Sequence, residues 1–91
     1  MLRITAIELK QPYHLVCTFN NGKRRNIDVE PILKKQAHIR GVTDLLDVKR
    51  FNEVEIGLAG EVCWRGVVQS GENRWDYDLS PEFVFAEGVP V

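Results

Sequence analysis

Six basic residues in the first half of the chain could form a binding site for phosphate groups. The six are Lys23, Arg24, Arg25, Lys34, Lys35 and Arg40. If the chain folds back, their charges form one positive patch near a hairpin tip, able to grip a nucleic-acid backbone. No helix-turn-helix, RNA-binding aromatic motif or recognition helix accompanies them, and the sequence pI of about 6.1 is low for such a domain. Direct nucleic-acid binding is therefore the second of our two functional hypotheses.

Two aromatic residues in the second half of the chain are candidates for a protein-binding surface. Trp75 and Tyr77 share one face of a short predicted strand, so that face points either into the core or outward. Outward-facing Trp and Tyr would anchor a protein interface, because both are enriched at binding hot spots. The sequence leaves the choice open for both residues. Trp64 shares a strand face with Val62, which predicts a core position.

The histidines and cysteines predict neither a metal site nor a catalytic thiol. His14 and Cys17 are three positions apart in a predicted strand, so their side chains fall on opposite faces. His38 and Cys63 have no partner at a zinc-binding spacing. We expect Cys17 to point inward, where burial raises the pKa of a thiol. Cys63 falls on the face opposite Val62 and Trp64, where it could be more exposed and Arg65 could favour its thiolate. No histidine is placed to act as its base, so we favour an ordinary strand thiol.

Two pairs of acidic residues could support acid–base chemistry. Asp76 and Asp78 share one strand face, as do Glu53 and Glu55. Two carboxylates held close together can have separated pKa values, which suits general acid–base catalysis. Alternating acids are also typical of the solvated face of an antiparallel sheet, and we favour that interpretation. No nucleophile-elbow motif or phosphate-binding glycine loop occurs. We therefore expect no enzyme activity, no catalytic residue and no cofactor.

Short antiparallel strands are expected to position these residues. Strict alternation in residues 13–19, the turn at 20–22 and residues 23–29 predict a hairpin. The remaining predicted strands cover residues 3–9, 53–58, 61–68 and 74–79. We expect 53–58 to pair with 61–68 and to point Val54, Ile56 and Leu58 inward. Residues 69–73 are expected to form a polar loop.

Two short helices complete the predicted fold. One covers residues 43–50 with Thr43 as its N-cap, and the other covers 81–86 with Ser80 as its N-cap and Pro81 in its first turn. Residues 32–42 are expected to form a loop or a helical turn. The order of elements predicts an α+β fold of antiparallel β-meanders and hairpins with two short helices, in a single small domain over residues 1–91.

Composition narrows the class of protein further. The chain has 91 residues with 44% hydrophobic and 27% charged residues, typical of one globular domain. No apolar run approaches the length of a membrane-spanning helix, and no signal peptide is recognisable. Two cysteines in apolar runs predict reduced thiols in a cytoplasmic protein. The net charge of −1 combines +5 in residues 1–50 with −6 in residues 51–91. Such an asymmetry is most often solvated charge or two complementary surfaces within one monomer. As a two-signed surface it also suits contact with another protein or a second copy.

Five short motifs spread over nearly the whole chain resemble the small bacterial family catalogued as domain of unknown function 2442. The residues that carry the resemblance are Tyr13, Leu15, Phe19, Asn21, Gly22 and Arg25; Asp28, Pro31, Ile32 and Leu33; Leu45, Asp47, Phe51 and Val54; Gly60, Val62 and Trp64; Asp78, Leu79, Pro81 and Glu82. The family usually reaches its last motif soon after the tryptophan. Here Asp78 follows Trp64 by 14 positions, so a hairpin arm over about residues 65–77 looks inserted.

The resemblance implies an α+β fold and no established enzyme activity. Members of the family occur alone, fused to helix-turn-helix domains, or encoded beside another small domain in pairs that look like toxin–antitoxin modules. Our leading hypothesis is therefore a non-enzymatic module that binds another protein in a regulatory or toxin–antitoxin-like context. A protein partner or self-association is expected, with no membrane and no metal.

Overall fold

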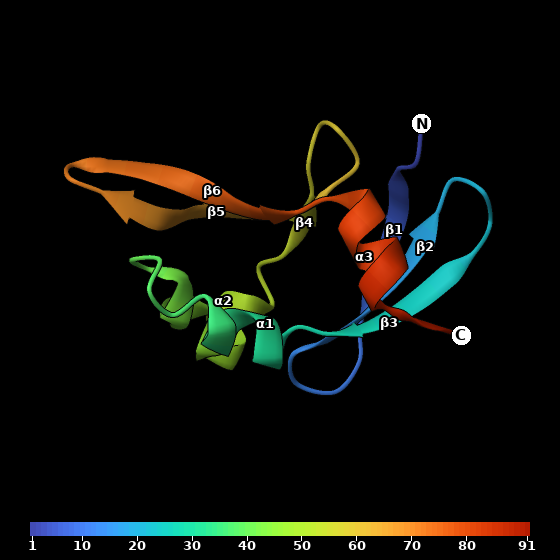
Figure 1. Cartoon of the computed structure of the whole chain (residues 1–91), viewed down its shortest axis with the longest axis horizontal. Coiled ribbons are helices and arrows are strands. Elements are labelled where there is room, and N and C mark those ends of the chain that lie inside the picture. Colours follow the sequence, from blue (N-terminus) through green and yellow to red (C-terminus); the bar gives the residue numbers. More distant parts are fainter.

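Two antiparallel β-sheets and three short α-helices form the fold in the computed structural model, which describes residues 1–91 (Figure 1). The predicted α+β class is confirmed. The sequence predicts two helices, and the additional one is the first along the chain, over residues 30–35. None of the helices is long and apolar enough to cross a membrane.

The first sheet has the strand order β1-β2-β3-β7. Its strands are β1 (Ile4–Leu9), β2 (His14–Phe19), β3 (Arg24–Asp28) and β7 (Val89–Pro90). The predicted hairpin of β2 and β3 is confirmed, with Leu15 opposite Ile27 in the ladder. The strand β7, which pairs with Arg25 and Asn26 on β3, was not predicted from the sequence. A strand of two residues, one of them proline, is too short to show the alternation from which a strand is predicted.

The second sheet has the order β4-β5-β6, with β4 (Glu55–Ile56), β5 (Val62–Ser70) and β6 (Asn73–Leu79). The strand predicted over 53–58 shortens to β4. Val54 packs against the core as predicted, but the inward assignment of Ile56 and Leu58 was wrong, because they are 37% and 96% exposed. The loop predicted over 69–73 was also wrong. Instead β5 continues to Ser70 and β6 begins at Asn73, which makes one long hairpin with Gly71 and Glu72 at its tip.

The helices differ from the prediction mainly between residues 30 and 51. Helix α1 (Glu30–Lys35) overlaps the start of the segment predicted as a loop or a helical turn, and Pro31 lies in its first turn. The helix predicted over 43–50 is divided at Asp47 into a 3-10 helix, η1 (Val42–Leu46), and helix α2 (Val48–Phe51). Asp47 has an extended backbone and caps α2 by accepting a hydrogen bond from the Lys49 N–H, so Thr43 is not the N-cap.

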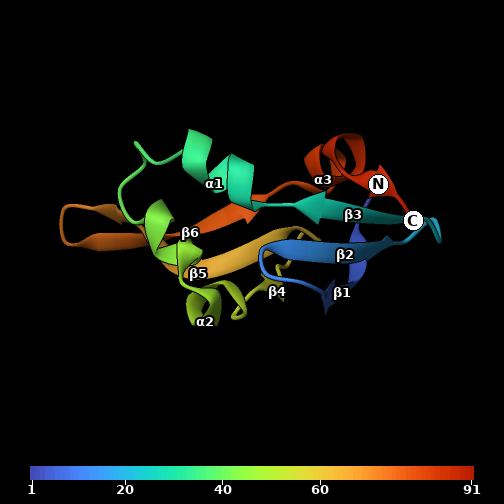
Figure 2. The same cartoon turned by 90° about the horizontal axis from the view of Figure 1, so that it is seen from below.

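Helix α3 (Pro81–Glu87) confirms the last predicted helix. The hydroxyl oxygen of Ser80 accepts a hydrogen bond from the Phe83 N–H at 3.1 Å, as expected for the predicted N-cap. In Figure 2, α1 and α3 lie on one side of the strands and α2 lies on the other.

Trp64 on β5 is buried in the core, as predicted. Its indole N–H donates to the Phe51 carbonyl oxygen at 2.8 Å, which ties the second sheet to the end of α2. The ring lies 5.4 Å from that of Phe51 and 5.9 Å from that of Tyr77, measured between centroids. These three rings join the second sheet and α2 into the same core as the first sheet.

Gly41 should be the glycine least tolerant of substitution. Its φ is +98°, and a Cβ there would lie 2.0 Å from the Val67 carbonyl oxygen, so Gly41→Ala adds a backbone clash to an unfavourable conformation. Gly22→Ala is the matched control, because its φ is +82° and a Cβ would meet nothing within 4 Å. In urea unfolding we expect losses of about 3 kcal/mol or more for Gly41→Ala and about 1 kcal/mol for Gly22→Ala. Equal losses would contradict the clash.

Candidate functional site

The hairpin of β5 and β6 projects from the rest of the molecule. Its tip lies at one end of the longest axis of the molecule, which measures 40 Å (Figure 1). Residues 65–77, which the sequence analysis described as a hairpin arm, form the outer part of this hairpin. We call residues 65–77 the arm. Its relation to the family domain, as an insertion, stays a prediction.

A large β-bulge in β5 lies where the arm begins. Trp64 pairs with Tyr77 and Val68 with Trp75, so three residues of β5 face the single Asp76 of β6. Gly66 permits the bulge with a φ of +65°. Its N–H donates to the Asp76 carboxylate at 3.0 Å, which holds the bulge against β6.

Arg74 also contacts the bulge. Its guanidinium donates to the Gly66 carbonyl oxygen at 3.3 Å. Since alternate residues of a strand point to opposite faces, Arg74 and Asp76 lie on one face of β6 while Trp75, Tyr77 and Leu79 lie on the other. The first face is charged, and the second continues the core face outward along the arm.

The structure separates the two aromatic candidates. Tyr77 is 6% exposed, and its hydroxyl donates to the side-chain oxygen of Gln36. Burial, and after it the negative charge of Asp78, raises the pKa of the Tyr77 hydroxyl. Trp75 is 59% exposed although it shares a face with Tyr77, because the body of the protein no longer covers the strand at that point. Tyr77 is therefore a core residue, and Trp75 is the surface residue of the pair.

The two edges of the arm also differ. The N–H of Gln69 on β5 donates to the Arg40 carbonyl oxygen at 2.9 Å, and β4 pairs with β5 nearer the body. The outer edge of β5 is therefore covered. The strand β6 pairs with β5 alone, and no backbone hydrogen bond outside that ladder involves residues 73–79. Residues 73–76 are all exposed, so the outer edge of β6 is open.

The six basic residues do not form the single patch that the sequence analysis expected. Residues 23–25 lie at the hairpin turn, where β3 begins, and the lysines of α1 follow its other end (Figure 1). Arg40 lies in a third place, in the segment whose carbonyl contacts β5. The chain does not fold back after β3, because α1 continues away from the hairpin tip.

Three of the six basic side chains are also engaged within the protein. Arg24 lies 3.4 Å from the Glu8 carboxylate, and Lys34 lies 3.1 Å from that of Glu30. The Arg25 guanidinium stacks over the Phe85 ring, 3.9 Å from its centroid. The charges that remain free of such contacts are Lys23, Lys35 and Arg40.

Of the two positions considered for Cys63, the structure shows the buried one. Cys63 is 4% exposed, and burial, together with the negative charges of Asp76 and Glu61, raises the pKa of its thiol to about 11. Arg65 acts in the opposite direction, but its guanidinium lies 2.6 Å from the Glu55 carboxylate. The inward position of Cys17 is confirmed, and burial raises its pKa to about 12. Both thiols are protonated at neutral pH.

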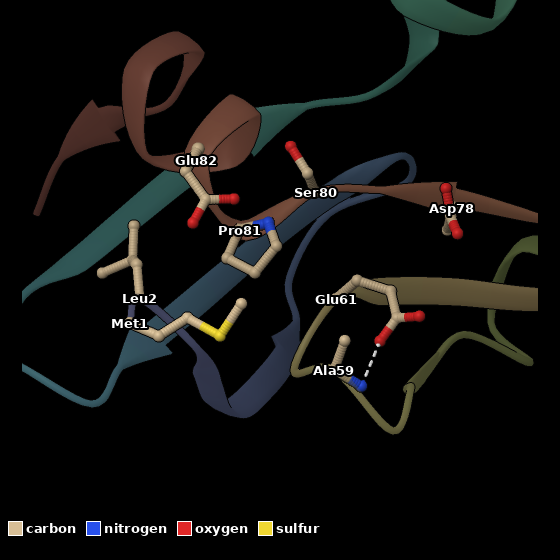
Figure 3. A pocket seen from close by; sticks show the side chains of 8 residues that line it. All are labelled: Met1, Leu2, Ala59, Glu61, Asp78, Ser80, Pro81 and Glu82. Carbon is tan, nitrogen blue, oxygen red and sulfur yellow. Dashed lines mark hydrogen bonds between the residues drawn. The ribbon is translucent and has the colours of Figure 1, made fainter.

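The acidic pairs are each divided between separate contacts. Glu53 pairs with Arg50 at 2.6 Å, whereas Glu55 pairs with Arg65. The Asp76 carboxylate accepts the Gly66 N–H. Asp78 instead lines a cavity of about 260 Å³ on the body of the protein (Figure 3). The lining residues of that cavity are Met1, Leu2, Ala59, Glu61, Asp78, Ser80, Pro81 and Glu82.

The chemistry of this cavity is acidic. Its three carboxylates come from separate elements, and that of Glu61 accepts the Ala59 N–H at 3.0 Å. Its one hydroxyl, that of Ser80, caps α3. No group of three His, Cys, Asp or Glu side chains is arranged to hold a metal ion.

Comparisons of this chain with protein-family models, curated proteins and solved structures find no match. The resemblance to the domain of unknown function 2442 therefore stays a prediction. The candidate site is defined by this structure alone, as the exposed Trp75 and the open edge of β6.

The buried thiols should react slowly in the folded protein. At pH 8 a pKa raised from 9.0 to about 11 lowers the thiolate fraction of Cys63 about 100-fold, and that of Cys17 falls further. We expect an aromatic disulfide reagent to modify the folded chain at least about 100-fold more slowly than the chain in guanidinium. Single Cys17→Ser and Cys63→Ser variants assign each rate. A fast phase that disappears in Cys63→Ser would contradict the protonated state of this thiol.

Proposed function

We propose that this chain is a non-enzymatic binding module whose arm contacts another protein chain. The observation that supports the proposal most directly is Trp75, a large aromatic side chain left 59% exposed on the arm. Exposed Trp is costly to maintain in water and is enriched at protein-binding hot spots. Val68, the cross-strand neighbour of Trp75, is half-buried and adds apolar surface beside it.

The charge distribution supports a protein partner as well. Arg74 and Asp76 place opposite charges on neighbouring positions of one face of β6, close to the open edge. Mixed charges around an aromatic residue are typical of the rim and centre of a protein interface. Such a surface favours a partner of mixed charge over a uniformly negative nucleic-acid backbone.

The proposal includes the regulatory or toxin–antitoxin-like setting that the family resemblance implies, in the cytoplasm of a bacterium. The two cysteines support a reducing compartment, since both are free and buried. The partner in this setting is a protein encoded with the chain, or a second copy of the chain itself.

Direct nucleic-acid binding through the six basic residues is the alternative. It has less support, because the six lie in three separate places and three of them contact Glu8, Glu30 or Phe85. In fluorescence anisotropy at about 50 mM salt we expect no binding of duplex or single-stranded DNA or RNA. Binding that weakens steeply with salt, and that drops when Arg24 and Arg25 are changed to Ala, would favour the alternative.

Replacing Trp75 should remove partner binding without unfolding the protein. The chain is immobilised and exposed to an extract of its source organism and to an untagged copy of itself, and retained proteins are quantified by mass spectrometry. We expect Trp75→Ala to lower the retained partner at least about tenfold. Leu58→Ala is the matched control, because Leu58 is 96% exposed but lies in the loop between β4 and β5, away from the arm (Figure 1).

Two results would count against the proposal. The first is a chain that retains neither another protein nor its own untagged copy. The second is an equal loss of retained partner for Trp75→Ala and Leu58→Ala, which would mean that the arm is not the binding surface.

A further inference from the structure

We propose that the partner of the arm is a second copy of this chain, joined through β6. Residues 73–77 of the two copies pair as antiparallel strands about a two-fold axis at Trp75. The two three-stranded sheets then become one sheet of six strands. This inference rests on the proposed function and names the partner of the same site.

The backbone of β6 has hydrogen-bonding groups available for such a pairing. Gln69 directs its N–H away from β6, to the Arg40 carbonyl oxygen, and Gln69 is the register partner of Arg74. In an antiparallel ladder, opposite residues either bond each other or both face away. Arg74 therefore directs its N–H and C=O away from β5, and Asp76 and Asp78 do the same by alternation.

This alternation restricts the possible registers. Residues that face outward must oppose residues that face outward, so the axis passes through a residue and not between two. An axis at Asp76 would set Arg74 against Asp78 of the other copy, but it would also set the Asp76 carboxylate against its own copy at the centre of the pair. An axis at Tyr77 would set Asp76 against Asp78, and an axis at Arg74 would set two guanidinium groups together. Each of these arrangements places like charges directly opposite, which destabilises the pair.

An axis at Trp75 has none of these conflicts between residues 73 and 77. It sets Arg74 of each copy against Asp76 of the other, so the dimer contains two pairs of opposite charge. The outward backbone groups of the same residues exchange hydrogen bonds across the axis. Glu72 lies in the turn, outside the paired segment. Charge complementarity therefore selects this register.

The same register also covers the exposed tryptophan. Trp75 opposes its own copy at a position without direct hydrogen bonds, where the Cα atoms of an antiparallel pair approach to about 4.5 Å and side chains meet most closely. The two indole rings then lie together on the core face of the joined sheet. Because the arm projects from the body (Figure 1), the two bodies lie at opposite ends of the paired strands and leave the axis free.

A charge exchange tests the register directly. Arg74→Asp and Asp76→Arg each place like charges opposite at two positions of the dimer, and we expect each to raise the dimer Kd at least about tenfold in sedimentation equilibrium. The double variant with both changes restores opposite charges and should return the Kd to within about threefold of the original. Circular dichroism checks that each variant is folded, since both residues also contact Gly66.

Amide hydrogen exchange provides a second readout that does not depend on a variant. In the monomer the N–H groups of Arg74 and Asp76 face solvent, whereas those of their neighbours on β6 bond to β5. We expect protection of these two amides to rise with protein concentration over the range in which the dimer forms. The amide of Gly22, in a turn far from the arm (Figure 1), should show no such change.

Three outcomes would overturn the self-pairing. The first is a chain that stays monomeric at millimolar concentration. The second is a dimer whose Kd ignores the charge variants, and the third is a double variant no better than the single ones. A monomeric chain that still retains another protein in a Trp75-dependent way would overturn this inference alone. The proposed function would then stand.

Discussion

The hydrogen bond from the Trp64 indole to the Phe51 carbonyl is the interaction on which the rest of the structure depends most. Helix α2 is only four residues long and could not persist without tertiary contacts. Trp64 supplies those contacts, because its ring packs between Phe51 and Tyr77 while its N–H satisfies the last carbonyl of the helix. A buried indole N–H without an acceptor would cost about 1–3 kcal/mol, and the Phe51 carbonyl removes that cost. The position of Trp64 therefore fixes both α2 and the inner part of β5.

The arm follows from this fixed point. Immediately after Trp64 the bulge at Gly66 changes the direction of β5, and the hairpin leaves the body. Along β6, Tyr77 and Trp75 are two positions apart on the same face, a separation of about 6.6–6.8 Å. That distance separates a side chain packed on Trp64 from one in solvent. Burial of an aromatic residue on this strand is therefore set by the extent of the body and not by the pattern of the strand itself.

This explains which features the sequence could predict. The hairpin of β2 and β3 and the Ser80 cap of α3 depend on residues adjacent in the chain, and both were predicted correctly. The exposure of Trp75, the burial of Cys63 and the dispersal of the basic residues depend on which distant segments cover them. The same holds for Asp47, whose extended backbone interrupts a stretch that is helical by pattern. The local periodicity of a sequence does not show which distant segments pack over a residue.

The open edge of β6 also results from the projection of the arm beyond the body. Proteins commonly protect edge strands with charged residues, bulges or short strand length. In this chain β6 has charges at Arg74, Asp76 and Asp78 and faces a bulge, yet it is seven residues long and pairs on one side only. If all the charges on this edge had the same sign, they would repel a second copy of the strand in any parallel or antiparallel register. The order of one base followed by two acids places like charges opposite each other when the axis lies at Arg74, Asp76 or Tyr77, whereas an axis at Trp75 gives only pairs of opposite charge between residues 73 and 77. The charges on this edge thus oppose indiscriminate strand pairing while permitting a single symmetric arrangement, and Trp75 lies at its centre.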